Sequence, residues 1–104
     1  MREYVRRLFE ELERGGESVL AARVGRALAG SDADVDAFVV SNDLWGGSGS
    51  IADQAGMDTG RASGRRAIEA ALIELGDQQV HVGKVNPRTA MWVEVFKEWR
   101  CDGI

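Results

Sequence analysis

The stretch from residue 45 to residue 53, Trp-Gly-Gly-Ser-Gly-Ser-Ile-Ala-Asp, has the residue types and spacing best suited to hold a ligand. Gly46, Gly47 and Gly49 permit positive φ, so successive backbone N–H groups of this loop can turn toward one anion. Ser50 is suited to cap a following helix, "IADQA", whose N-terminus would then point toward the same anion. One hypothesis is therefore that this loop is a pocket for a small molecule or an anion, with a minor enzymatic activity.

The same stretch also has a structural interpretation, which its residue types favour. It lacks the lysine that a phosphate-binding loop places after its last glycine, and Asp43 and Asp53 on either side would repel a phosphate. A tryptophan directly before a glycine turn, as at Trp45, is typical of a loop that packs back on the core. Asp53 is placed to accept hydrogen bonds from loop amides. We expect a rigid corner, whose tryptophan is either buried or available to a partner.

Residues for catalysis or metal binding are sparse. The chain has one histidine, His81, and one cysteine, Cys101, and these two residues, twenty positions apart, do not have metal-ligand spacing. We therefore expect a non-catalytic protein without cofactor or metal. A single cysteine is typical of a reducing compartment, and the charged N-terminal segment is not a secretory signal. No apolar run approaches the roughly 18 residues that cross a bilayer, so we expect a cytoplasmic protein without membrane contact.

The net charge of −4 is concentrated in the middle third of the chain. Residues 1–30 and 61–104 each have a balance of +1, whereas residues 31–60 contain six aspartates and no lysine or arginine. Because binding to nucleic acid needs positive charge, such a surface predicts a cationic partner and no nucleic acid. The six aspartates are Asp32, Asp34, Asp36, Asp43, Asp53 and Asp58.

The glycine stretch resembles a motif of small bacterial proteins that share a domain of unknown function. In that motif an aromatic residue is followed by two glycines, a small residue or Met, Gly-Ser, an apolar residue and Asn-Asp. The resemblance implies that the stretch is a fixed corner of a helical fold, and it implies no activity. The matching residues here are Trp45-Gly46-Gly47-x-Gly49-Ser50-Ile51-x-Asp53, with Ala52 where the motif often has Asn.

The elements that would position these residues are mainly helices. Apolar residues at helical spacing predict one helix that ends at Gly15-Gly16 and a second that ends at Gly30. The sequence "SDAD" at residues 31–34 offers an N-cap with acids in the first turn of a short third helix. "RRAIEAALIEL", residues 65–75, is the clearest helix, and we expect Gly76 to end it.

The C-terminal third allows two structures. Residues 79–85 alternate like a strand, with Val80 and Val82 on one face. The segment "NPRTAMWVEVFKEWR" then forms either its hairpin partner or a helix with Trp92 and Phe96 on one face, and the helix is favoured. We therefore expect one domain over residues 1–104, a mainly α, compact bundle of about five helices with a glycine-rich corner in the middle. An α+β fold with a C-terminal hairpin is the alternative.

This size and charge, without a catalytic pattern, are typical of immunity proteins and small adaptors. We predict that the chain binds a basic protein partner, such as a toxin domain, and is itself a monomer or a homodimer. The glycine loop of Gly46, Gly47, Gly49 and Ser50 is expected to have a structural role. The predicted partner-binding residues are Asp32, Asp34, Asp36, Asp43, Trp45 and Asp53.

Overall fold

The computed structural model describes residues 1–57 and 62–101. This part of the chain contains seven helices and no strand, so the mainly α fold is confirmed, with seven helices instead of about five. The helices are α1 (Arg2–Arg14), α2 (Ser18–Leu28), α3 (Asp32–Val39), α4 (Asn42–Trp45), α5 (Ile51–Met57), α6 (Ala62–Val82) and α7 (Thr89–Cys101).

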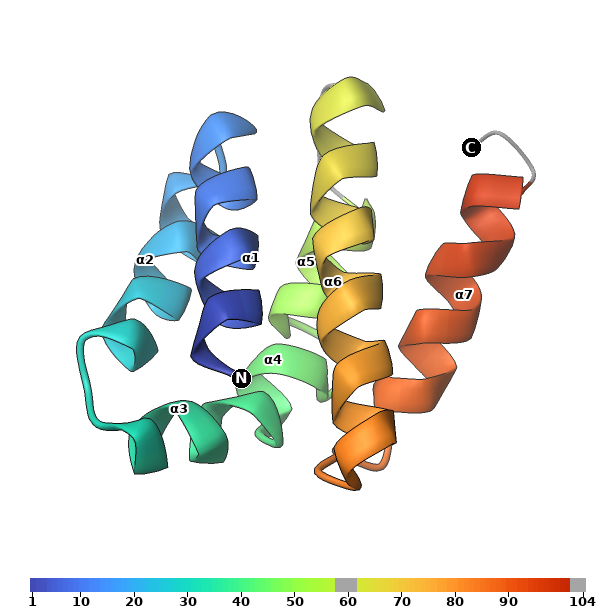
Figure 1. Ribbon diagram of the computed structural model, residues 1–104. Helices are drawn as coiled ribbons and strands as arrows, with labels where there is room; N and C mark the ends of the chain where they lie inside the picture. The colour runs from blue at the N-terminus through green and yellow to red at the C-terminus, as the bar shows by residue number, and fades with distance from the viewer. Residues whose placement is uncertain (58–61, 102–104) are drawn as a thin grey trace.

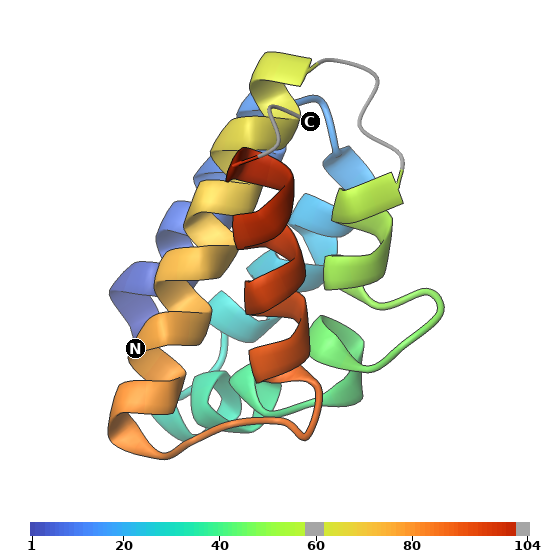
Figure 2. The same ribbon diagram turned by 90° about the vertical axis from the view of Figure 1, so that its right-hand side faces the viewer.

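The four longest helices stand roughly side by side, and the short ones close one end and the back of the bundle. α1 packs between α2 and α6, and α7 packs on the other side of α6 (Figure 1). α3 and α4 cross the end of the molecule at which α1 begins. Figure 2 shows the connection between α6 and α7 passing under the same end. Residues from the two halves of the sequence therefore meet around α3 and α4.

Each long helix contributes one apolar stripe to a common core. In α1, Val5, Leu8 and Leu12 follow helical spacing and are fully buried, because this face of α1 packs against both α2 and α6. On the surface, Arg7 of α1 forms an ion pair with Glu74 of α6. The hydrogen bond from that pair raises the pKa of the Arg7 guanidinium above its ordinary value.

Gly76 does not end α6, and the expected boundary there is wrong. α6 continues to Val82, and Gly76 lies inside it, where α7 crosses close by. A Cβ on Gly76 would overlap Cγ2 of Val93 and would stand 3.4 Å from Cη2 of Trp45. The glycine therefore serves close helix packing, although glycine lowers helix propensity by about 1 kcal/mol.

The expected strand over residues 79–85 is also wrong, because α6 continues to Val82 and Gly83 follows its last residue. Gly83 has φ +77°, a left-handed conformation that glycine adopts without steric cost. The N–H of Lys84 donates to the carbonyl of Gln79 at 2.9 Å, and the N–H of Gly83 donates to that of Val80 at 3.2 Å. This glycine-terminated ending satisfies the last helical carbonyls, so residues 80–82 form the last turn of α6.

The helical interpretation of the C-terminal segment is confirmed. α7 begins at Thr89, after a turn in which Asn86 N–H donates to Thr89 Oγ1 at 3.0 Å. The rings of Trp92 and Phe96 are stacked with centroids 5.6 Å apart, and Phe96 meets Trp99 edge-on at 5.8 Å. These three aromatic residues thus share the side of α7 that faces the core.

Candidate functional site

Trp45 is fully buried, and both its ring and its backbone are tied to the core. Its indole Nε1 donates to Oε1 of Gln79 at 2.9 Å, and its carbonyl accepts from Nε1 of Trp92 at 3.0 Å. Of the two alternatives that the sequence left open, the ring is thus the buried one. Trp45 has no exposed surface with which to make the partner contact predicted for it.

The glycine loop uses its own polar groups to hold its shape. Oγ of Ser50 accepts from the N–H of Asp53 at 3.1 Å, which confirms the expected cap of α5. Oδ2 of Asp53 accepts from the N–H of Gly49 at 3.0 Å, and the N–H of Ser50 donates to Gly47 O at 3.1 Å. Because these donors are bonded within the loop, they do not offer the free amides that an anion cradle needs.

Gly46 and Gly47 are required for different reasons. Gly47 has φ +68°, a conformation that is strained for any residue with a side chain. Gly46 has φ −85°, and a Cβ there would overlap the backbone and Cβ of Asn42. A Cβ on Gly47 would also meet the guanidinium of Arg88, which lies over the loop.

Gln79 connects the corner to two other segments, and sequence reasoning missed it. Besides accepting from Trp45, its Nε2 donates to the carbonyl of Val39 at 2.6 Å and to that of Lys84 at 2.8 Å. The side chain is fully buried, so each of these bonds replaces one to water. Gln79 lies seven residues after Leu72, which places it on the buried side of the helix. This position could have identified Gln79, but only if α6 had been predicted to continue past Gly76.

Asn86 makes the matching connection from the turn before α7. Its Nδ2 donates to the carbonyl of Val40 and to Oδ1 of Asn42, each at 3.0 Å. Asn86 is buried and its Oδ1 accepts from the N–H of Arg88 at 2.9 Å. The turn between α6 and α7 thereby fixes the junction of α3 and α4, the two helices on which Asp32, Asp34, Asp36 and Asp43 lie.

The acidic residues of α3 and α4 lie on two consecutive short helices, and we call these four residues together the acidic face: Asp32, Asp34, Asp36 and Asp43. Residues 31–60 contain no lysine or arginine, yet three of these aspartates face a basic side chain from another part of the fold. The pairs are Asp32 with Arg2 at 2.9 Å, Asp43 with Arg23, and Asp36 with Lys84 at 3.5 Å.

The remaining aspartates have backbone roles or lie outside the described residues. Asp34 forms a capping box with Ser31, in which Ser31 N–H donates to Oδ2 of Asp34 at 2.9 Å. Asp53 bonds to the glycine loop, as above, and Asp58 is outside the described residues. The charge excess of the middle third is therefore partly offset in three dimensions by Arg2, Arg23 and Lys84, which the sequence does not reveal.

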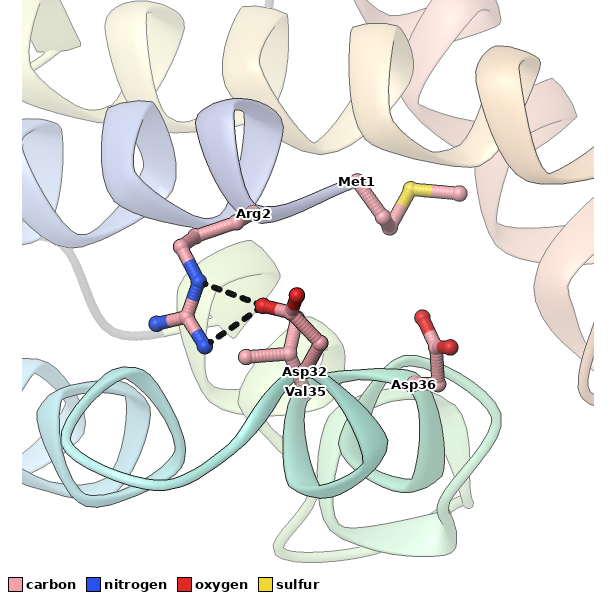
Figure 3. A pocket seen from close by; sticks show the side chains of 5 residues that line it. All are labelled: Met1, Arg2, Asp32, Val35 and Asp36. Carbon is pink, nitrogen blue, oxygen red and sulfur yellow. Dashed lines mark hydrogen bonds and ion pairs between the residues drawn. The ribbon is translucent and has the colours of Figure 1, made fainter.

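Arg2 fastens α1 to the start of the acidic face, and a cavity lies beside it. The Nη1 of Arg2 donates to Leu28 O at 2.7 Å, its Nη2 to Gly30 O at 3.1 Å, and its Nε to Oδ1 of Asp32 at 3.0 Å. The cavity next to these groups has a volume of about 290 Å³ (Figure 3). It is lined by Met1, Arg2, Asp32, Val35 and Asp36.

A buried carboxylate lies elsewhere, on α6. Glu69 is fully buried, and its Oε1 is 3.5 Å from Nε of Arg65, one turn earlier in the same helix. A buried carboxylate is costly unless it has a cationic partner, so the nearby guanidinium is consistent with a structural ion pair. Neither residue belongs to the acidic face.

Other candidate chemistry is limited in the part of the chain that the structure describes. His81 is exposed in the last turn of α6, and the side chain of Cys101 lies outside the described residues. No group of three or more His, Cys, Asp or Glu side chains that could hold a metal occurs among residues 1–57 and 62–101. Over the same residues, no helix combines the length and the apolar character needed to cross a membrane.

Comparison with known proteins identifies no relative: no protein-family model, no curated protein and no solved structure matches this chain. The resemblance of residues 45–53 to a bacterial motif therefore stays a prediction, and function has to be inferred from the geometry of the acidic face.

Proposed function

We propose that the chain is a non-catalytic protein-binding domain that binds a basic protein partner through the acidic face. One observation carries the proposal: Asp32, Asp36 and Asp43 keep 92%, 47% and 51% of their side-chain surface exposed, although each faces a base. Exposed ion pairs contribute only about 0–1 kcal/mol. Cationic side chains of a partner can therefore compete for these carboxylates at little cost to the fold.

The distribution of the bases also supports this proposal. The carboxylates lie on two consecutive helices, whereas Arg2, Arg23 and Lys84 reach them from three different parts of the chain. Val40, between Asp36 and Asp43 in sequence, is 37% exposed and is an apolar side chain that a partner can contact. An apolar centre with a charged rim is the usual composition of a transient protein interface. An immunity protein that neutralises a basic toxin domain belongs to this functional class.

The glycine loop is the weaker candidate for a ligand site. Its amides at Gly49 and Ser50 are bonded within the loop, and Gly46 N–H donates to the carbonyl of Asn42 at 2.8 Å. Trp45, the aromatic residue nearest to it, is fully buried and cannot stack on a ligand. We therefore assign the corner a structural role and assign binding to the acidic face.

The test is an association-rate measurement on a partner purified with the chain from its native cell. Asp36 and Asp43 are replaced together by Asn, since neither is part of the helix cap or bonded to Arg2. At low salt the double variant should associate about tenfold more slowly, because fewer carboxylates steer the encounter. The difference should shrink at high salt, where charges further apart than a few ångström are screened.

The matched control removes two negative charges elsewhere. Glu94 and Glu98 are both exposed on α7, which lies on the far side of α6 from α1 (Figure 1). Their replacement by Gln changes the net charge equally and should slow association much less. Equal slowing by both double variants, or rates that do not respond to salt, would show that the acidic face is not the binding surface.

A further inference from the structure

We propose that two copies of this chain pair end to end, through the end of the bundle at which α3 and α4 lie (Figure 1). This inference goes beyond the proposed function, which concerns a different protein as partner. Both contacts would use Asp36 and Val40, so a second copy and a protein partner would compete for this end of the molecule.

Exposed large apolar side chains gather at this end. Among the residues that the structure describes, six large hydrophobic side chains are exposed, and five of them lie directly after α3, in the last turn of α6, in the connection that follows it or in the first turn of α7. Figure 1 shows these segments at the same end of the molecule. Single exposed apolar residues are ordinary, whereas a group of them marks an interaction surface. The five residues, which we call the apolar end, are Val40 (37% exposed), Val80 (52%), Val82 (46%), Val85 (44%) and Met91 (48%).

Two buried amide side chains hold the segments of the apolar end together. Nδ2 of Asn86 donates to the carbonyl of Val40 at 3.0 Å, which ties the turn before α7 to the residue after α3. Nε2 of Gln79 donates to the carbonyl of Val39 at 2.6 Å and to that of Lys84 at 2.8 Å. The backbone of the apolar end is therefore already fixed in the monomer, and association should cost little further ordering.

The charged side chains around the apolar end carry both signs, as expected of a surface that binds its own copy. Asp36 and Asp43 lie on α3 and α4, and Lys84 and Arg88 lie on the connection between α6 and α7. A two-fold rotation can set the acidic side of one copy against the basic side of the other, whereas a surface of one sign would repel its copy. Asp36 and Lys84 already face each other within one chain at 3.5 Å. The dimer does not require that pair to break, because it depends on apolar contact without opposed like charges.

The test is sedimentation equilibrium of the whole chain without any partner. Because four of the five apolar side chains are valines, we expect a transient dimer with a dissociation constant on the order of 0.1–1 mM. The mean mass should therefore rise with concentration from the 11.3 kDa of one chain toward twice that value. Val85→Asp should weaken the dimer at least tenfold, because the interface would bury a carboxylate without a partner. The matched control Val19→Asp adds the same charge at the start of α2, at the opposite end of the molecule, and should dimerise as the native chain does (Figure 1).

Two charge reversals test the two-fold arrangement. Asp36→Lys leaves a surplus of bases around the apolar end, and Lys84→Asp leaves a surplus of acids there. Each variant alone should stay monomeric at concentrations at which the native chain dimerises, since like charges then oppose each other. An equimolar mixture of the two variants should dimerise again, because each copy faces the opposite sign. Damage to the fold by either substitution would persist in the mixture, so recovery identifies a contact between chains.

Three outcomes overturn this inference: a mean mass that does not rise with concentration, equal weakening by Val85→Asp and Val19→Asp, or a mixture of the charge reversals that remains monomeric. Amide chemical shifts of the native chain give a further measurement that needs no variant. On dilution they should change at residues 36–43 and 80–91, and changes centred on α2 would also overturn the dimer. A monomeric chain leaves the proposed function standing if the Asp36/Asp43 double variant still slows partner association. If that variant has no effect on a partner, the proposed function fails and a dimer found by sedimentation stands.

Discussion

The glycine corner, residues 45–53, and helix α3, residues 32–39, are close in sequence and opposite in character. The corner faces inward: Trp45 is fully buried and bonded to Gln79, and Asp53 is turned back on a loop amide. α3 buries Val35, Phe38 and Val39, but its acidic side chains face outward: Asp32 is 92% exposed and its bond to Arg2 lies at the surface. Both stretches look like binding sites in the sequence, and the exposed carboxylates that a partner can reach lie on α3.

Because of this difference, substitutions in the two regions should change different properties: stability for the corner and association for the acidic face. Changes in the corner remove buried contacts and should lower the free energy of unfolding. Changes on the acidic face remove exposed charges, which contribute little to stability and more to association. Substitutions at Trp45, at Gly76, at Gly47 and Gly49, and at Asp36 test this separation, and they are ordered here by the expected loss of stability.

Trp45→Ala should have the largest effect, about 3–5 kcal/mol, as for other large buried aromatic residues. It removes a fully buried ring and leaves Oε1 of Gln79 without its donor. Against a total stability of roughly 5–15 kcal/mol, the melting temperature should fall clearly. Trp45→Phe keeps most of the ring and loses the N–H, so it should cost about 1–3 kcal/mol.

Thermal and urea unfolding of both variants measures these losses, and partner affinity measured well below the melting temperature should stay close to native. A Trp45→Ala protein with native melting temperature and no partner binding would place the ring in the interface instead of the core.

Gly76→Ala tests the tight contact between α6 and α7 that seats the corner. In an open helix this change would stabilise by about 1 kcal/mol. Here the new methyl group would overlap Val93 and approach Trp45, so we expect destabilisation by about 1–3 kcal/mol. The sign of the measured change in unfolding free energy therefore distinguishes a crowded contact from an open helix position. The double variant Gly76→Ala/Val93→Ala should be more stable than the sum of its parts, because the second change makes room for the methyl group.

These glycines also show how far the sequence could predict the fold. The apolar spacing correctly predicted helices in α1, α2, α3 and α7. The end of α6 was misplaced, because Gly76 and Gly83 have the same local signature. One of them packs against α7 and the other takes the left-handed conformation that ends the helix. The choice depends on a tertiary contact with Val93, which local spacing does not contain.

The candidate site was also predicted only in part, because local features can be read from the sequence and contacts between distant residues cannot. The Ser31 and Ser50 caps depend on residues three positions apart, and both were found from the sequence. The bases that face Asp32, Asp36 and Asp43 come from residues 20 to 48 positions away, so the sequence shows the local charge excess and does not show the ion pairs that partly offset it. Gln79 depends on contacts with residues 34 and 40 positions away, and it was missed entirely.

Gly47→Ala and Gly49→Ala should each cost about 1–2 kcal/mol, since both glycines have positive φ, at +68° and +84°. Gly47 carries an additional contact, because its new methyl group would meet the Arg88 guanidinium, whereas nothing lies within 4 Å at Gly49. Gly47→Ala should therefore be slightly the more destabilising. Combining each with Arg88→Ala should remove the difference. If Gly47→Ala and Gly49→Ala were both as stable as the native chain, the corner would not be rigid.

Asp36→Asn should have the smallest effect on stability and a clear effect on association. Its carboxylate is 47% exposed and 3.5 Å from Lys84, so the free energy of unfolding should change by no more than about 0.5 kcal/mol. Partner association at low salt should nevertheless slow severalfold, because this carboxylate contributes to the charge of the acidic face. Melting curves and association rates for Asp36→Asn and Trp45→Ala, measured on the same preparations, therefore give opposite patterns. If Asp36→Asn lowered the melting temperature as much as Trp45→Ala while leaving association unchanged, α3 would be a structural element and the contrast between the two regions would disappear.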